Sequence, residues 1–213
     1  MTFCFVVGAV AAASLCLGVF FLSDGAVRKA IQFSLARRVG GLFSPRLIVV
    51  GDSLAASCPW RRLAAHPFAV LNLAMGGATL KEIAGQIYRS RDIAADFLLV
   101  NGGLNDLLFD QAEARQIEAD FLALSRRIEG RTVIVTLMPF TSDPARTAHI
   151  VKANELLSRL CRQFGYCTVD LNASVSVDGV RRPDMTEDGL HFTGAADRIW
   201  LAAIRDALSR ARI

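Results

Sequence analysis

Three residues, Ser53, Asp188 and His191, have the types and spacing of a site for nucleophilic chemistry at an acyl group. Ser53 follows Leu47-Ile48-Val49-Val50-Gly51-Asp52, in which an apolar run typical of a buried parallel strand leads into a turn. A serine hydroxyl is a weak nucleophile at neutral pH unless a base takes its proton. Asp188 precedes His191 by three residues, so its carboxylate could hold one imidazole nitrogen and leave the other for Ser53.

Two further residues could stabilise the negative charge that develops on a carbonyl oxygen during acyl transfer. Gly76 lies in Met75-Gly76-Gly77, after a second apolar run, and can offer a backbone N–H with no Cβ in the way. Asn105 follows a third apolar run and can offer a side-chain amide.

The remaining histidines and a second carboxylate are weaker candidates. His66 precedes Pro67 and is expected in a surface turn, whereas His149 is expected on a helix as a surface or core residue. Asp184 is a rival partner for His191. No cluster of His and Cys has the spacing of a metal site, so we expect no metal.

Five short apolar runs alternate with helix-compatible segments along the chain. This pattern specifies a five-stranded parallel sheet with helices on both faces. The first three strands end in loops rich in Gly, Ser and Asn, and such loops share the edge of the sheet where ligands bind. The predicted strands are 47–50, 69–74, 97–100, 132–137 and 166–171, and the predicted helices are 55–65, 80–90, 111–128, 146–164 and a last one from Gly194.

The blocks that carry the candidate residues resemble those of the GDSL or SGNH hydrolase family. Any one of them is common by chance, but four in the family's order, spanning Arg46 to the C-terminus, identify the chain as a member. The blocks are Gly51-Asp52-Ser53-Leu54, Asn72 through Gly76-Gly77, Gly103-Leu104-Asn105-Asp106 (Gly-x-Asn-Asp) and Asp188-Gly189-Leu190-His191 (Asp-x-x-His).

The resemblance implies roles for these residues. Ser53 would be the nucleophile, His191 the general base and then acid, and Asp188 the residue that orients the imidazole. The oxyanion hole would consist of the Ser53 N–H, the Gly76 N–H and the Asn105 side chain. The implied fold is a flavodoxin-like three-layer α/β/α sandwich, the SGNH hydrolase fold, which needs no metal and no cofactor.

The N-terminal segment is apolar, with no charged residue from Phe3 to Leu22. About 20 apolar residues suffice to span a bilayer as a helix. We favour an uncleaved single-span anchor over a signal peptide, because no Lys or Arg precedes the run and no clear cleavage site follows it. A buried helix of the folded domain is a third interpretation. The predicted parts are an anchor or signal segment (1–22), a basic amphipathic linker (23–45) and an SGNH hydrolase domain (46–213).

The side of the membrane is left open by two conflicting signals. Basic residues of the linker suit anionic headgroups and favour the cytoplasm. Cys161 and Cys167 flank a predicted turn, and they are either a disulfide, which would indicate a periplasmic or other oxidising compartment, or two core thiols. Cleavage of the N-terminal segment would instead make the protein secreted. The basic residues of the linker are Arg28, Lys29, Arg37 and Arg38.

The composition limits the other classes of partner. The chain is 53% hydrophobic and carries a net charge of +4, but its arginines are interleaved with acidic residues and its aromatic residues are few. This pattern does not favour nucleic-acid binding.

The sequence therefore predicts a membrane-tethered serine esterase that cleaves acyl esters through an acyl-enzyme. Small acyl groups on glycans, short-chain lipid esters or thioesters are the expected substrates. An acyltransferase or deacetylase acting on surface polysaccharide is one alternative, and a non-catalytic binding protein with the same fold is another. We expect an open site, and Met138-Pro139-Phe140 either lines an acyl pocket or packs in the core.

Overall fold

The computed structural model describes residues 34, 45–63 and 69–211 of the chain. The predicted anchor (1–22) and all of the predicted linker (23–45) except Ser34 and Pro45 lie outside the described residues, as does His66. Within the described residues, no helix is both long and apolar enough to span a membrane.

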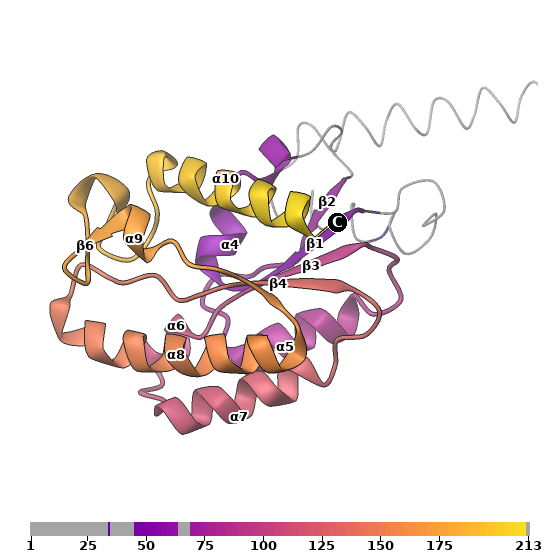
Figure 1. Cartoon of the computed structure of the whole chain (residues 1–213), viewed down its shortest axis with the longest axis horizontal. Coiled ribbons are helices and arrows are strands. Elements are labelled where there is room, and N and C mark those ends of the chain that lie inside the picture. The colour runs from indigo at the N-terminus through magenta and orange to yellow at the C-terminus, as the bar shows by residue number, and fades with distance from the viewer. Residues whose placement is uncertain (1–33, 35–44, 64–68, 212–213) are drawn as a thin grey trace, which may run out of the picture.

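Five parallel strands form the central sheet, as the alternating pattern predicted, and the structure shows their order to be β2-β1-β3-β4-β5 (Figure 1). Two interior strands, β1 and β3, are buried along their whole length, which explains their continuous apolar sequence. The bounds are β1 Leu47–Val50, β2 Val70–Asn72, β3 Phe97–Asn101, β4 Thr132–Thr136 and β5 Cys167–Val169.

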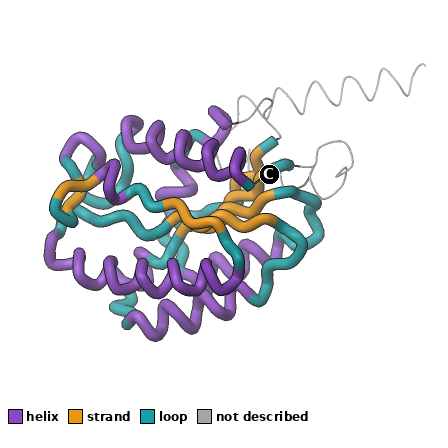
Figure 2. The backbone as a smooth tube through the Cα atoms, in the orientation of Figure 1, coloured by secondary structure: helices purple, strands orange, loops and turns teal. Residues whose placement is uncertain are grey.

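Helices cover both faces of the sheet and make a three-layer sandwich (Figure 2). Figure 1 shows α4 and α10 on one face and α5, α7 and α8 on the other. The bounds are α4 Ser53–Ser57, α5 Leu80–Arg89, α6 Leu104–Leu108, α7 Ala114–Ser125, α8 Thr147–Phe164, α9 Asn172–Val175 and α10 Gly194–Arg210.

Several elements differ from the predicted ones. The helix predicted at 55–65 ends at Ser57, and after Pro59 the chain forms the 3-10 helix η1, Trp60–Leu63. The predicted loop after β3 contains α6. The predicted loop before Asp188 contains α9, a two-stranded antiparallel hairpin of β6 (Ser176–Val177) and β7 (Val180–Arg181), and the 3-10 helix η3 (Pro183–Met185); another 3-10 helix, η2, is Pro144–Arg146. These elements are too short for hydrophobic periodicity to reveal them.

Trp200 fixes α10 to the sheet. Its side chain is fully buried, and its indole N–H donates to Thr136 Oγ1 at the end of β4 over 3.0 Å. Its ring meets Trp60 and Phe192 edge to face, with centroids 4.9 and 5.6 Å apart. Because His191 lies three residues before α10, this packing also fixes the position from which the imidazole projects.

Gln86 of α5 holds the end of β1 from the opposite face. Its side-chain oxygen accepts from the Gly51 N–H over 2.7 Å, and its amide nitrogen donates to the Gly51 carbonyl over 3.0 Å. A Cβ at Gly51 would lie 2.6 Å from the Asn101 carbonyl and 2.9 Å from the Ala55 Cβ, so only glycine lets α4 pack this closely against β3. The strand end that leads into Ser53 is therefore held from both faces.

Candidate active site

Ser53 is the first residue of α4, at the carboxyl edge of the sheet where β1 ends. Asp52 caps this helix, because its Oδ1 accepts from the Leu54 N–H over 3.0 Å. The first N–H groups of a helix have no partner within it, so the Ser53 N–H is available at this edge. Ser53 itself is half-buried.

The structure brings His191 and Asp188 to Ser53. His191 Nε2 lies 3.0 Å from Ser53 Oγ, and His191 Nδ1 lies 2.7 Å from Asp188 Oδ2. Ser53 and His191 are 138 residues apart in the chain, so the fold rather than local sequence creates this contact. We call these three residues the candidate triad.

The Asp188 carboxylate is held in its ionised form. Its Oδ2 accepts from the His191 ring, and its Oδ1 accepts from the backbone N–H groups of His191 and Leu190 over 2.7 and 2.9 Å. These hydrogen bonds hold the pKa of Asp188 well below its usual range. A carboxylate can only accept, so His191 Nδ1 carries the proton in this pair and the neutral Nε2 is free to accept from the serine hydroxyl.

The loop that carries Gly76 is tied to its neighbours on both sides. At its start, the Met75 N–H donates to the Gly51 carbonyl over 3.0 Å, which places the loop beside the approach to Ser53. At its end, Asn105 Nδ2 donates to the Ala78 carbonyl over 3.0 Å. Gly76 lies exposed in the turn, with open space where a Cβ would stand.

Two more family-block residues complete this framework. Asn72 Nδ2 donates to the Ala55 carbonyl over 3.0 Å and thereby ties the end of β2 to α4. Asp106 accepts from the Leu80 N–H at the start of α5, with both carboxylate oxygens within 3.2 Å. Burial raises the pKa of Asp106. The Gly76 loop is thus fixed between the helix of Ser53 and the helix of Asn105.

Asp52 is almost fully buried beneath the candidate triad. Burial raises the pKa of Asp52 to about 6, while its hydrogen bonds from the backbone of Leu54 and Ala55 and the nearby charge of His191 oppose that rise. This carboxyl therefore titrates closer to neutrality than an ordinary aspartate. Its position is structural, because it caps the helix that begins at Ser53.

Arg181 of β7 is buried under the loop that carries Asp188 and His191. Its side chain is 1% exposed, and it donates to the Phe140 carbonyl over 2.7 Å and to the Leu190 carbonyl over 2.9 Å. Its guanidinium lies over the Phe192 ring, 4.5 Å from the centroid. Burial lowers the pKa of Arg181 to about 10, and the negative charge of Asp188 opposes that change. Arg181 thus fixes the residues on both sides of His191.

A groove of about 420 Å³ adjoins Asp188 on the same edge. Both apolar and polar side chains line it, and Phe109, which is 68% exposed, contributes an aromatic surface. We call it the Asp188 groove. Its lining residues are Leu108, Phe109, Thr141, Ser142, Asp143, Arg146, Asp188, Gly189 and Leu190.

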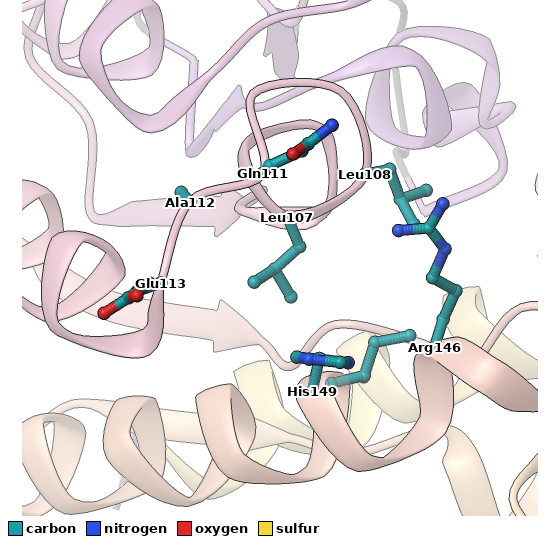
Figure 3. Close-up of a pocket in the computed structure, with 8 residues that line it drawn as sticks. Leu107, Leu108, Gln111, Ala112, Glu113, Arg146 and His149 are labelled. Carbon is teal, nitrogen blue, oxygen red and sulfur yellow. The ribbon is translucent and has the colours of Figure 1, made fainter.

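Figure 3 shows a second cavity, which has a volume of about 270 Å³. Arg146 and Leu108 line both cavities, so the second cavity is a neighbour of the groove. Leu107 points into this cavity from α6, and the imidazole of His149 faces it from α8. None of the candidate triad residues lines it.

Other predicted residues have mostly structural surroundings. Asp184 pairs with Arg182 over 3.2 Å, whereas His191 is bonded to Asp188. Met138 is buried in the core beside Gly103. Cys161 and Cys167 are both free thiols. Among residues 45–63 and 69–211, no three His, Cys, Asp or Glu side chains lie close enough together to hold a metal ion.

Residues 49–199 match the GDSL-like Lipase/Acylhydrolase family, which covers more than half of the chain. The chain belongs to this family. Its members are acylhydrolases, and this assigns the GDSL-like chain to the ester hydrolases.

Solved structures with the same fold include other GDSL-like proteins. A putative acylhydrolase from Bacteroides fragilis is 17% identical, with a TM-score of 0.67 over 83% of this chain and 95% of its own. A GDSL-like lipase from Bacteroides thetaiotaomicron is also 17% identical, with a TM-score of 0.67 over 88% and 98%. A carbohydrate esterase family 3 protein from Talaromyces cellulolyticus is 16% identical, with a TM-score of 0.60 over 78% and 97%. At these identities the likeness is one of fold.

Curated relatives include N-acylneuraminate cytidylyltransferases from strains of Streptococcus agalactiae. One is 27% identical over 155 residues, which are 70% of this chain and 35% of that protein. The GDSL-like chain therefore spans about a third of the length of the curated relatives it matches.

Two residues that shape the site were not predicted from the sequence. Gln86 falls within the apolar stripe of α5, three residues after Ile83, and a polar residue at such a position was a usable signal. No sequence signal marked Arg181 as the buried arginine, because the adjacent Arg182 is the same residue type and is partly exposed. Only the hairpin β6–β7 decides which of the two arginines is buried.

Replacing Asp52 with asparagine should change how stability depends on pH. The folded-state pKa of Asp52 is raised, so its favourable contribution is complete below the unfolded pKa and is lost as pH rises through about 6. Asp52→Asn keeps the helix cap but removes this ionisation. Relative to the parent chain, the free energy of unfolding of the variant should be higher by up to about 3 kcal/mol at pH 7.5 and almost unchanged at pH 4. Urea unfolding at both pH values measures the difference, and an equal effect at both would contradict the assignment.

Replacing Arg181 with methionine should slow chemistry at Ser53 while leaving KM nearly unchanged. The change removes charged hydrogen bonds that each contribute about 1.5–3 kcal/mol, so we expect a decrease of about tenfold or more in kcat. Arg181→Lys should restore part of the rate, because an ammonium can still reach one of the two carbonyls. Arg182→Met is the matched control, since the neighbouring side chain is partly exposed, and it should retain the parent rate. Equal losses at both arginines would refute the positioning of His191 by Arg181.

Proposed function

We propose that this protein is a serine esterase in which Ser53, His191 and Asp188 act as a catalytic triad. The observation that carries the proposal is the continuous hydrogen-bonded path from Ser53 Oγ through the imidazole of His191 to the carboxylate of Asp188. Membership of the acylhydrolase family supports the same chemistry.

In the first half-reaction, Nε2 of His191 takes the hydroxyl proton as Ser53 Oγ attacks the ester carbonyl. Ionised Asp188 stabilises the resulting imidazolium and keeps it oriented. The imidazolium then gives its proton to the departing alcohol, which leaves an acyl group on Ser53. Water activated by the same nitrogen releases the acid in the second half-reaction.

The oxyanion would accept from three donors: the N–H groups of Ser53 and Gly76, and the side-chain amide of Asn105. The Asn105 nitrogen bears two hydrogens, and its bond to the Ala78 carbonyl uses one of them and orients the other. The exposed turn at Gly76 leaves its backbone accessible to a ligand. Donors fixed in advance are worth most in such a site, because they need no reorganisation during the reaction.

We propose acylated sugars as the substrate class. The Asp188 groove combines apolar surface with hydroxyl, carboxylate and guanidinium groups, which suits a sugar that has both an apolar face and hydroxyls. The names of the curated relatives, which act on N-acylneuraminate, support a carbohydrate over a long acyl chain. The carbohydrate esterase among the proteins of the same fold agrees with this choice.

We also propose that residues 1–22 tether the esterase to a membrane, which is motivated by their uncharged, apolar sequence. Carbonate extraction of membranes from cells that express the full chain tests the tether. The protein should stay in the membrane pellet, and release into the supernatant would contradict anchoring.

Replacing Ser53 with alanine should reduce hydrolysis of p-nitrophenyl acetate by at least about 10³-fold, the scale expected for a nucleophile that acts in a triad. Ser57→Ala is the matched control, because Ser57 lies one turn later in the same helix and its hydroxyl donates to the Ser53 carbonyl. It should keep the parent rate. Undiminished turnover in Ser53→Ala would end the proposal, as would failure of a fluorophosphonate to label the parent chain at Ser53.

A further inference from the structure

Arginines collect at the amino edge of the sheet, opposite the candidate active site. This edge consists of the starts of the strands and the ends of the long helices. We call the set the basic edge: Arg46, Arg91, Arg126, Arg127, Arg131, Arg162 and Arg210. Four acidic residues, Asp92, Asp96, Glu129 and Asp206, accompany it in the described part of the chain.

More than half of these arginines are free to meet a partner. Arg46 pairs with Asp96 over 2.9 Å, Arg91 lies 3.5 Å from Asp92, and Arg131 donates to backbone carbonyls. The other four side chains form no ion pair or hydrogen bond with any described residue and are exposed: Arg126, Arg127, Arg162 and Arg210.

The opposite edge has the reverse charge. Eight acidic side chains are exposed there, beside four partly or fully exposed basic residues, Lys81, Arg115, Arg146 and Arg182. The acidic residues are Asp110, Glu113, Asp143, Asp170, Asp178, Asp184, Glu187 and Asp188. The folded domain is therefore strongly polarised from one edge of its sheet to the other, although its total charge is small.

Two exposed aromatic side chains accompany the basic edge. Tyr88 is 53% exposed at the end of α5, with the Arg91 guanidinium 3.9 Å from its ring centroid. Phe164 is 38% exposed at the end of α8 and stacks on Tyr166, with centroids 5.5 Å apart. Aromatic rings next to cations are the side chains that favour the headgroup region of a bilayer.

Favourable interactions with helix carbonyl ends explain part of this distribution, because cations stabilise helix C-termini. They also explain Arg131, which donates to the Ser90 carbonyl at the end of α5, but they do not explain Arg46, which precedes a strand, or the aromatic residues. The place where the chain enters the folded domain explains the remaining residues of the basic edge. Strand β1 starts at this same edge, directly after a sequence that holds the apolar run 3–22 and four basic residues.

We propose that the basic edge binds the anionic surface of the bilayer to which the N-terminal segment is tethered. Each arginine near such a surface adds to the attraction, and together they orient the folded domain. The candidate active site then faces away from this bilayer, toward water. The consequence for the substrate rests on the proposed function. In this orientation, the esters that reach Ser53 are water-exposed acylated glycans rather than lipids of the same membrane.

Arginine footprinting of the full chain tests the proposal. The protein is reconstituted with vesicles of phosphatidylcholine alone or mixed with phosphatidylglycerol, treated with phenylglyoxal and analysed by mass spectrometry. Anionic vesicles should slow the modification of Arg126, Arg127 and Arg162 by about fivefold or more, and high salt should reverse this protection. Arg115 and Arg146, near the opposite edge, should react at the same rate with both lipids.

Matched triple variants make the test specific. Arg126→Gln/Arg127→Gln/Arg162→Gln should abolish the protection of the remaining Arg210. The control Arg115→Gln/Lys152→Gln/Arg198→Gln removes the same charge from exposed positions elsewhere and should retain protection. Both variants should hydrolyse p-nitrophenyl acetate at the parent rate, because none of the six positions lies in the site.

Equal modification rates with both lipids would overturn the proposal, and so would protection of Arg115 and Arg146. Protection by a soluble nucleic acid or polysaccharide, but not by anionic vesicles, would overturn it as well and would indicate a different polyanion partner. If the parent chain has no esterase activity but anionic vesicles still protect its arginines, the proposed function is refuted and the membrane-binding role of the basic edge stands.

Discussion

The carboxylate of Asp188 organises the candidate site, because it accepts three hydrogen bonds from a single four-residue turn. Two of them come from the backbone and shape the turn, and the third sets the tautomer of His191. The same group therefore determines both where the imidazole points and which nitrogen can accept a proton. Its support comes from the protein interior, where Arg181 holds the Leu190 carbonyl and Trp200 anchors the helix that follows.

The parallel sheet makes this arrangement possible with short strands. Every strand ends at the same edge, so loops from distant parts of the chain meet there without long excursions. The polar residues next to the reacting groups mainly bind these loops to one another: Asn72 to α4, Asn105 to the Gly76 loop, and Asp106 to α5. Asp52 contributes in the same way and loses favourable solvation by doing so, which is the origin of its raised pKa.

The sequence predicted the order of the strands and helices because their apolar runs are long enough to show a period. It also predicted which loops meet, since this follows from parallel topology, and the candidate triad residues do lie together. Chain segments of two to five residues, such as α6 and the hairpin β6–β7, are too short to show a period. The burial of Arg181 could not be predicted, because it depends on two carbonyl groups that only the folded chain brings to the guanidinium. Phe140, which supplies one, is 41 residues away in the chain, and Leu190, which supplies the other, is nine residues away. Cys161 and Cys167, which as a disulfide would have indicated an oxidising compartment, are free thiols in the fold.

The start of β1 and the end of α10 lie at the same edge of the sheet, remote from Ser53 (Figure 1). A domain with this layout can be joined to another protein at either end without obstructing its reactive side. Such modularity is consistent with the curated relatives, in which the matching region occupies only 35% of a longer polypeptide. Fusion to new neighbours can therefore change where this chemistry is delivered without any change to the chemistry itself.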